Sequence, residues 1–182
     1  VISSLEKHSK NFINLSPFVV ISSKGKNGHA DVSPRGDSVG FVKIQDDKTI
    51  IIPDRSGNNR LDTLENIIFD PSVGTLFFIP GINTVLRING NALIEDNLEI
   101  RAQFKINNNI PKTCIIINIE EIFMHCAKAL MRSSFWDHSK YLSQTEFPTI
   151  SKIINDQLNS EDDEQNHEQE DIRYKKQIIK FG

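Results

Sequence analysis

The feature that most constrains the fold of this chain is the order of its strand-like and helix-like segments. Most of the first two thirds consists of short runs, largely apolar and β-rich, separated by turn residues, as expected of β-strands. These runs lie at 17–23, 29–33, 41–44, 49–52, 73–79, 84–94 and 115–123. One helical segment, 58–70, separates the fourth strand from the fifth. A doubly wound fold needs helices that alternate with strands throughout, so this order predicts a barrel or a sandwich.

Two segments in this part of the chain have the helical period. In 3–13 the apolar residues repeat at helical spacing, and Ser3 or Ser4 would be the N-cap. The second helix ends before Pro71, and the residues expected on its apolar face are Leu61, Leu64, Ile67 and Ile68. Residues 24–28 (KGKNG) and the pair Asp46 and Asp47 have the composition of hairpin connections.

The chain changes character after Trp136. Polar residues lead to a predicted helix from Thr149 to Leu158, then to an acidic segment, 161–171, and a short stretch from 172 to 181. We interpret the acidic segment as a solvated loop, with a partner-binding tail as the alternative. The sequence thus divides into an N-terminal helix (1–16), a central domain (17–137) and a C-terminal helical and acidic extension (138–182).

Charge and cysteine content exclude several classes of function. The acidic segment holds seven of the 24 acidic residues, and without it 21 basic side chains face 17 acidic ones. Such a mildly basic body suits a small anionic ligand, but no Lys/Arg run or interleaved aromatics point to nucleic acid. Two cysteines are too few for a disulfide scaffold, and the sequence has no metal-binding HExxH motif. No apolar run is long enough to cross a membrane. We therefore expect a cytoplasmic protein without a metal site.

The segment 54–60 (DRSGNNR) is the first candidate site. It follows an apolar strand and opens a helix, where free backbone N–H groups attract anions. Arg55 and Arg60 could then donate charge-assisted hydrogen bonds to a phosphate. The alternative is an ordinary loop in which Asn59 caps the helix and Asp62 completes a capping box.

Two further segments could carry chemistry. In 31–37 (DVSPRGD), Ser33 and Arg35 share one face of an extended chain and could form an anion site, although Pro34 and Gly36 also fit a strand end and turn. In 125–136 (HCAKALMRSSFW) two cations and an aromatic ring recur about one helical turn apart. They could hold an anionic aromatic ligand, or the ring could pack in the core while the cations are solvated. These three residues are Lys128, Arg132 and Trp136.

Taken together, four ordered blocks resemble one family. The blocks are DVSPRGD, IIPDRSGNNRLDTLENI, DPSVGTLFFIPGINTVLRINGNA and HCAKALMRSSFWD. From about Phe18 to Asp137 the chain is similar to the pyridoxamine 5′-phosphate oxidase-related, FMN-binding split-barrel proteins, and most similar to an uncharacterised bacterial subgroup. The resemblance implies a mainly β (α+β) fold, a split β-barrel with peripheral helices, and a homodimer with flavin mononucleotide (FMN) at its interface.

The resemblance also implies roles for particular residues. Ser33 and Arg35 would line the flavin and its phosphate, and Pro53 and Arg55 would lie at the end of the next strand. Lys128, Arg132 and Trp136 would approach the flavin from the partner chain. The residues near the phosphate at the start of the helix would be Asn58, Asn59 and Arg60.

Departures from the family pattern leave the reaction open. The strand RxVLLK of true pyridoxamine-phosphate oxidases is replaced by ADVSPR, and their C-terminal substrate-binding block is not found. Oxidation of vitamin B6 is therefore disfavoured. The leading hypothesis is an FMN-dependent oxidoreductase that acts on a small molecule, with NADH or NADPH as a candidate donor. The alternative is a flavin or haem carrier, or a sensor without turnover.

Overall fold

A computed structural model describes residues 1–55, 57, 60–160 and 162–181. The chain forms two compact units, Val1–Trp136 and Asp137–Gly182. None of the helices in the described ranges is both long enough and apolar enough to cross a membrane.

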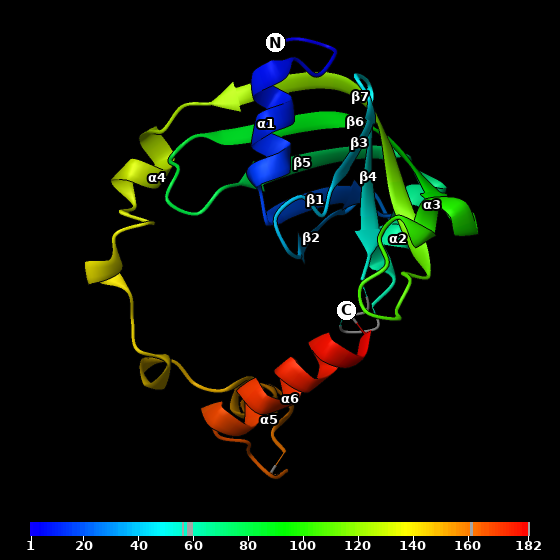
Figure 1. The fold of residues 1–182 in the computed structure, drawn as a ribbon. Coiled ribbons are helices and arrows are strands. Elements are labelled where there is room, and N and C mark those ends of the chain that lie inside the picture. The colour runs from blue at the N-terminus through cyan, green and yellow to red at the C-terminus, as the bar shows by residue number, and fades with distance from the viewer. Residues whose placement is uncertain (56, 58–59, 161, 182) are drawn as a thin grey trace. The chain divides into compact units, whose positions relative to one another are not determined.

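The first unit is built on one antiparallel sheet of seven strands (Figure 1). Its order is β2-β1-β5-β6-β7-β4-β3, so β2 and β3 are the edges. The strands are β1 (Phe18–Lys24), β2 (Ala30–Gly36), β3 (Lys43–Asp46), β4 (Thr49–Asp54), β5 (Ser72–Phe78), β6 (Val85–Glu95) and β7 (Thr113–His125). The predicted succession of seven strands along the chain, with one helix between the fourth and the fifth, is confirmed.

The sheet curls into a barrel that stays open between its two edges. Figure 1 shows β3 and β4 running at a steep angle to β5 and β6. In the described chain no ladder joins β2 to β3, yet ion pairs connect the ends of β2 and β4. Gly90 lies so close to β7 that an added Cβ would be 2.1 Å from the carbonyl oxygen of Asn118, beside an irregularity in the β6–β7 register. Such an irregularity increases local twist and helps the sheet curl.

One hydrophobic core fills the barrel. Along β6 the inward apolar side chains alternate with outward polar ones from Leu86 to Ala92. Leu86 and Ile88 of this strand and Ile117 of β7 have no exposed surface. Phe12 and Ile13 of α1 (Lys7–Leu15) belong to the same core. Ile2, in the segment before α1, forms a bridge to Ile122 of β7. The N-terminal helix is therefore an integral part of the first unit.

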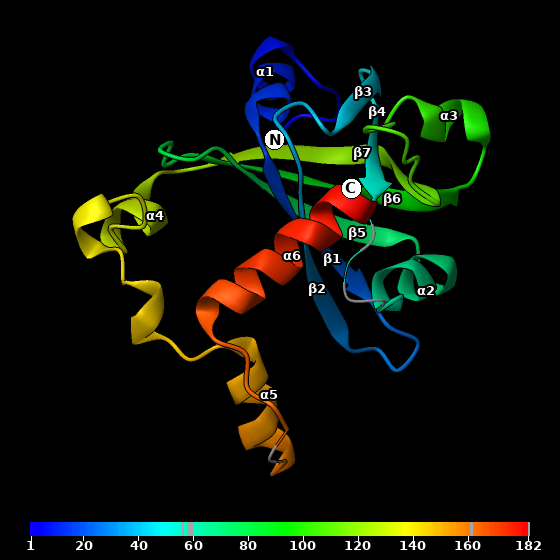
Figure 2. The ribbon, with the colours of Figure 1, turned by 60° about the horizontal axis from the view of Figure 1, so that its bottom comes forward.

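Helix boundaries differ from the sequence expectations. The first helix begins at Lys7, because the Glu6 carboxylate, rather than Ser3 or Ser4, accepts hydrogen bonds from the first turn. The second helix, α2 (Asp62–Phe69), lies beside β1 (Figure 2).

The apolar face predicted for α2 is partly wrong. Ile67 is buried and Leu64 packs against the core, but Leu61 precedes the helix and Ile68 is 77% exposed. Thr63, which was not predicted on the apolar face, is buried together with Ile67.

Strand β2 continues through Pro34 to Gly36, beyond the strand end expected at residue 33. Because β2 is an edge strand, the missing N–H of Pro34 leaves no gap in a second ladder. This extension keeps Ser33 and Arg35 in extended backbone.

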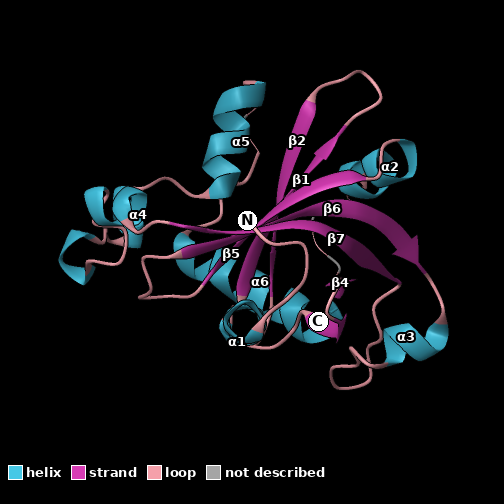
Figure 3. Ribbon diagram, turned by 90° about the horizontal axis from the view of Figure 1, so that it is seen from above, coloured by secondary structure: helices cyan, strands magenta, loops and turns pink. Residues whose placement is uncertain are grey.

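Two short helices flank β7. Helix α3 (Leu98–Ala102) was not predicted and lies outside the sheet (Figure 3). Just beyond it, Phe104 packs with Ile51, Cys114 and Ile116 in a second small cluster on the outer face. Helix α4 (Lys128–Arg132) follows β7.

The second unit is mostly helical. After two 3₁₀ turns, η1 (His138–Lys140) and η2 (Gln144–Glu146), come α5 (Ile150–Leu158) and α6 (His167–Phe181). The prediction of a helix from Thr149 to Leu158 is confirmed, with Thr149 as its N-cap. The interpretation of 161–171 as a loop throughout is wrong, because α6 begins at His167.

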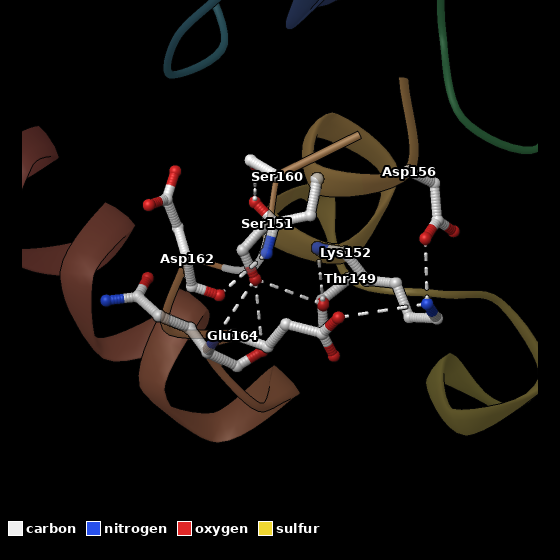
Figure 4. A network of polar contacts seen from close by, with 9 residues as sticks. Thr149, Ser151, Lys152, Asp156, Ser160, Asp162 and Glu164 are labelled. Carbon is white, nitrogen blue, oxygen red and sulfur yellow. Dashed lines mark hydrogen bonds and ion pairs between the residues drawn. The ribbon is translucent and has the colours of Figure 1, made fainter. Parts of the chain in front are cut away.

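A polar network joins the two helices of this unit. The Glu170 carboxylate is 6% exposed and accepts hydrogen bonds from the backbone N–H groups of Ile150 and Ser151. Figure 4 shows the neighbouring contacts, in which the Lys152 ammonium lies 3.0 Å from Asp156 and 3.7 Å from Glu164. Glu170 thus accepts hydrogen bonds from N–H groups that have no partner within α5, and its negative charge stabilises the positive end of the helix dipole.

Candidate functional site

A cavity of about 570 Å³ opens where the edge strand β2 approaches the end of β4. Residues 31–36 line one side, and the chain around Asp54, Arg55 and the start of α2 lines the other. Two of the three predicted segments, DVSPRGD and DRSGNNR, therefore meet although about 20 residues separate them. The curl of the sheet brings them together.

Arg35 is the central side chain of the cavity. Its Nη1 donates hydrogen bonds to the Ser33 hydroxyl at 2.5 Å and to the Pro34 carbonyl at 2.9 Å, and its Nη2 lies 3.7 Å from Asp54 Oδ1. The prediction that Ser33 and Arg35 share a face is confirmed. Arg35 Nε is buried and has no hydrogen-bond partner among the described residues. A buried N–H without an acceptor is costly, so this donor suits a ligand oxygen.

The carboxyl group beside Arg35 has an unusual environment. Burial raises the pKa of Asp54 above its ordinary value, although the Arg35 charge acts in the opposite direction. Desolvation therefore outweighs the ion pair, and a proton is held more tightly than on an exposed aspartate.

A second ion pair crosses the same opening. Arg55 Nε lies 2.8 Å from Asp37 Oδ2, and the two side chains are only 15% and 14% exposed. Arg55 follows β4 and Asp37 follows β2, so this contact ties the two strand ends together. Arg55 also lines the cavity, whereas Pro53 is buried within β4 and does not.

The third predicted arginine lies at the rim. Arg60 is exposed and its Nε lies 2.7 Å from Asp62 Oδ2. Asp62 is the first residue of α2, and among the described residues no side chain caps this helix. Asn58 and Asn59, also predicted to bind phosphate, lie outside the described residues.

The third predicted segment lies elsewhere in the first unit. Lys128 and Arg132 are the first and last residues of α4, and both are exposed. The helix ends at Arg132, and Ser134 has a positive φ of 52°. Trp136 is therefore not on the same helical face; its indole N–H donates a hydrogen bond to the Ile82 carbonyl at 3.0 Å. None of the three lines the cavity.

One cavity residue was missed by the sequence analysis. Lys112 lines the cavity from the segment before β7. It is placed there because Thr113 pairs with Asp54 in the β4–β7 ladder, which sets Lys112 beside Arg55. Only the strand register could have shown this, and a single sequence does not give the register.

Comparison with known proteins gives a family and a fold. A family model described as pyridoxamine 5′-phosphate oxidase matches residues 5–126. HupZ of Group A Streptococcus is 21% identical, with a TM-score of 0.54 over 66% of this chain and 93% of its own. A candidate pyridoxamine 5′-phosphate oxidase of Lactobacillus delbrueckii is 17% identical, with a TM-score of 0.53 over 67% of this chain and 95% of its own.

A third solved structure, an F420 reductase, is 11% identical, with a TM-score of 0.50 over 65% of this chain and 98% of its own. No curated protein sequence matches the chain. At these identities the solved structures show the fold alone, and they confirm the predicted split barrel of the α+β class.

Proposed function

This chain belongs to the pyridoxamine 5′-phosphate oxidase family, and on that premise we propose that it is a homodimeric flavoprotein that binds FMN and uses it to oxidise or reduce a small molecule. The observation that carries the proposal is the cavity between β2 and β4. Its volume of about 570 Å³ lies within the range of small-molecule sites, and it is lined by several cations.

The cavity residues fit a phosphate group. Arg35 Nε is buried and offers a hydrogen bond that no described residue accepts, and the Ser33 hydroxyl lies beside it. Arg55 and Arg60 add further guanidinium groups, which bind phosphate oxygens through short charge-assisted bonds. Pro53 would shape the strand end, and Asn58 and Asn59 remain in the proposed set.

Bound FMN would supply the electron-transfer chemistry, and the chain would hold and orient it. NADH or NADPH is the proposed electron donor, and the small-molecule substrate is left open. Oxidation of pyridoxamine phosphate is disfavoured because the substrate-binding block of the true oxidases is not found after Trp136.

The outer face of the sheet supports a homodimer. Val32, Phe18 and Phe123 lie on this face of β2, β1 and β7, and they are 62%, 39% and 38% exposed. Apolar side chains gathered on one exposed face mark an interface, and a second copy related by a two-fold axis would cover it. Light scattering should then give the mass of a dimer, and a monomer with flavin bound would contradict the proposal.

The partner copy would complete the flavin site. We place Lys128, Arg132 and Trp136 near the flavin of the other protomer, since they do not line the cavity of their own chain. A cation beside the flavin raises its reduction potential. Neutralising Lys128 or Arg132 should therefore lower the midpoint potential without dissociating the dimer.

A carrier or sensor without turnover is the second candidate. Two observations favour it: no histidine is among the described cavity residues, and the arginines there are paired with carboxylates. Reduction of the bound flavin by NADH or NADPH, followed by reoxidation with a defined acceptor, would identify an enzyme. A flavin that neither nucleotide reduces would favour the carrier, and a haem spectrum would replace the flavin altogether.

Titration with FMN and riboflavin tests the phosphate site. Arg35→Gln and Arg60→Gln should each weaken FMN binding about tenfold or more and leave riboflavin binding unchanged, because each loses a charge-assisted contact. Lys26→Gln, in an exposed hairpin turn, is the matched control. If both arginine variants bind FMN as the wild type does, the phosphate lies elsewhere.

A further inference from the structure

Lys112 differs from the other cations of the cavity. Arg35, Arg55 and Arg60 are each paired with an aspartate, at 3.7, 2.8 and 2.7 Å. Lys112 lines the same cavity, and among the described residues no carboxylate pairs with it. Its charge is therefore the one in this cavity that no carboxylate of the described chain compensates.

The backbone that carries Lys112 is firmly held. Pro111 is buried, and its carbonyl accepts a hydrogen bond from Arg101 Nη1 at 3.0 Å. The same guanidinium donates through Nε to the Asp96 carbonyl at 2.7 Å. On the other side, Thr113 enters the β4–β7 ladder opposite Asp54. The Lys112 Cα is thus fixed at the cavity, while its long side chain is exposed and able to reach inward.

We propose that Lys112 is the specificity-determining cation of this cavity and selects ligands that carry a phosphate or a comparable anionic group. The identity of that ligand as FMN rests on the function proposed above. The selection itself rests only on the cavity and on the pairing of its charges.

The physical reason is competition. An anion that binds one of the three arginines, for example at the unpartnered Nε of Arg35, is also repelled by the aspartate paired with that guanidinium. An anion at Lys112 meets no such competitor. The ammonium group is a compact point charge with three donors, which suits phosphate oxygens in any orientation.

The test compares Lys112→Gln with Lys105→Gln, a matched control, because Lys105 is exposed on the same segment and does not line the cavity. Inorganic phosphate, FMN and riboflavin are titrated separately, by calorimetry for phosphate and by fluorescence for the flavins. Lys112→Gln should weaken phosphate and FMN binding about tenfold and leave riboflavin unchanged. Lys112→Arg should restore most of the loss, and Lys105→Gln should match the wild type.

The outcomes separate this inference from the flavin proposal. Equal FMN and phosphate affinities in Lys112→Gln and the wild type would overturn the role of Lys112 and leave the flavin proposal intact. Phosphate binding that depends on Lys112, without any flavin binding, would support Lys112 and refute FMN. A wild-type protein that binds neither phosphate nor FMN would overturn both. Should Lys112→Gln fail to fold, Lys112→Glu is titrated in its place. An unchanged FMN affinity in Lys112→Glu, or a loss of riboflavin binding in the same proportion as FMN binding, would equally overturn the inference.

Discussion

Replacing Asp37 by asparagine should destabilise the first unit, because it breaks the ion pair that ties the end of β2 to the end of β4. Arg55 Nε and Asp37 Oδ2 are 2.8 Å apart and both side chains are about 15% exposed. The gross attraction at this distance is about 6 kcal/mol in an effective dielectric of about 20. Much of it is offset by desolvation, and the amide oxygen of the replacement side chain can still accept a hydrogen bond. We therefore expect a loss of about 2 kcal/mol.

Urea unfolding of the wild type, Asp37→Asn, Arg55→Gln and the double variant measures this directly. The two single losses should not add in the double variant, and the coupling energy should be about 1 kcal/mol or more. Additivity within about 0.3 kcal/mol would show that the two side chains do not stabilise each other, and the close approach of the ends of β2 and β4 would then need another explanation.

Three further predictions concern single groups. Burial raises the pKa of Asp54, so the folded state binds this proton more tightly than the unfolded state does; the contribution of Asp54 to stability is full below pH 3.8 and is lost as the pH rises through the raised pKa. Asparagine does not ionise, so the urea midpoint of Asp54→Asn should rise relative to that of the wild type as the pH goes from acid to neutral. Burial also raises the pKa of Cys114 to about 11, so at pH 8 a thiol reagent should label only the exposed Cys126, and a native stoichiometry of two would contradict the structure. Ile117 is a fully buried core residue, so Ile117→Ala should lower the free energy of unfolding in urea by about 2–5 kcal/mol. Ile68 is 77% exposed, so Ile68→Ala should change this free energy by less than about 0.5 kcal/mol.

The sequence was most informative where one period governs a segment. In 84–94 the alternation is long and has one buried face, so Leu86 and Ile88 could be assigned to the core. The helix predicted from Thr149 to Leu158 was equally clear, and the structure has it over Ile150–Leu158. In both cases a local pattern fixes the local structure.

Long-range features explain the errors. Pro34 reads locally as a turn residue, and only its place on an edge strand makes an extended conformation acceptable. Trp136 is one helical turn from Arg132 in spacing, but the helix stops before it. Periodicity does not show where such a short helix ends.

The candidate site was predicted in part. The segments around Arg35 and Arg55 were expected, and the structure brings them to one cavity. Their pairing with Asp54 and Asp37 depends on the curl of the whole sheet, and the place of Lys112 depends on the β4–β7 register. Neither quantity is encoded in a local pattern, so neither could be derived from the residues alone.

The absorbance spectrum of the purified protein, recorded before and after addition of FMN and removal of the unbound excess, tests the central claim most directly. The account predicts two broad bands in the near-ultraviolet and the blue, retained at one flavin per chain. A sharp Soret band, or a spectrum without flavin after the excess is removed, would contradict the claim that this family member holds FMN in the cavity between β2 and β4.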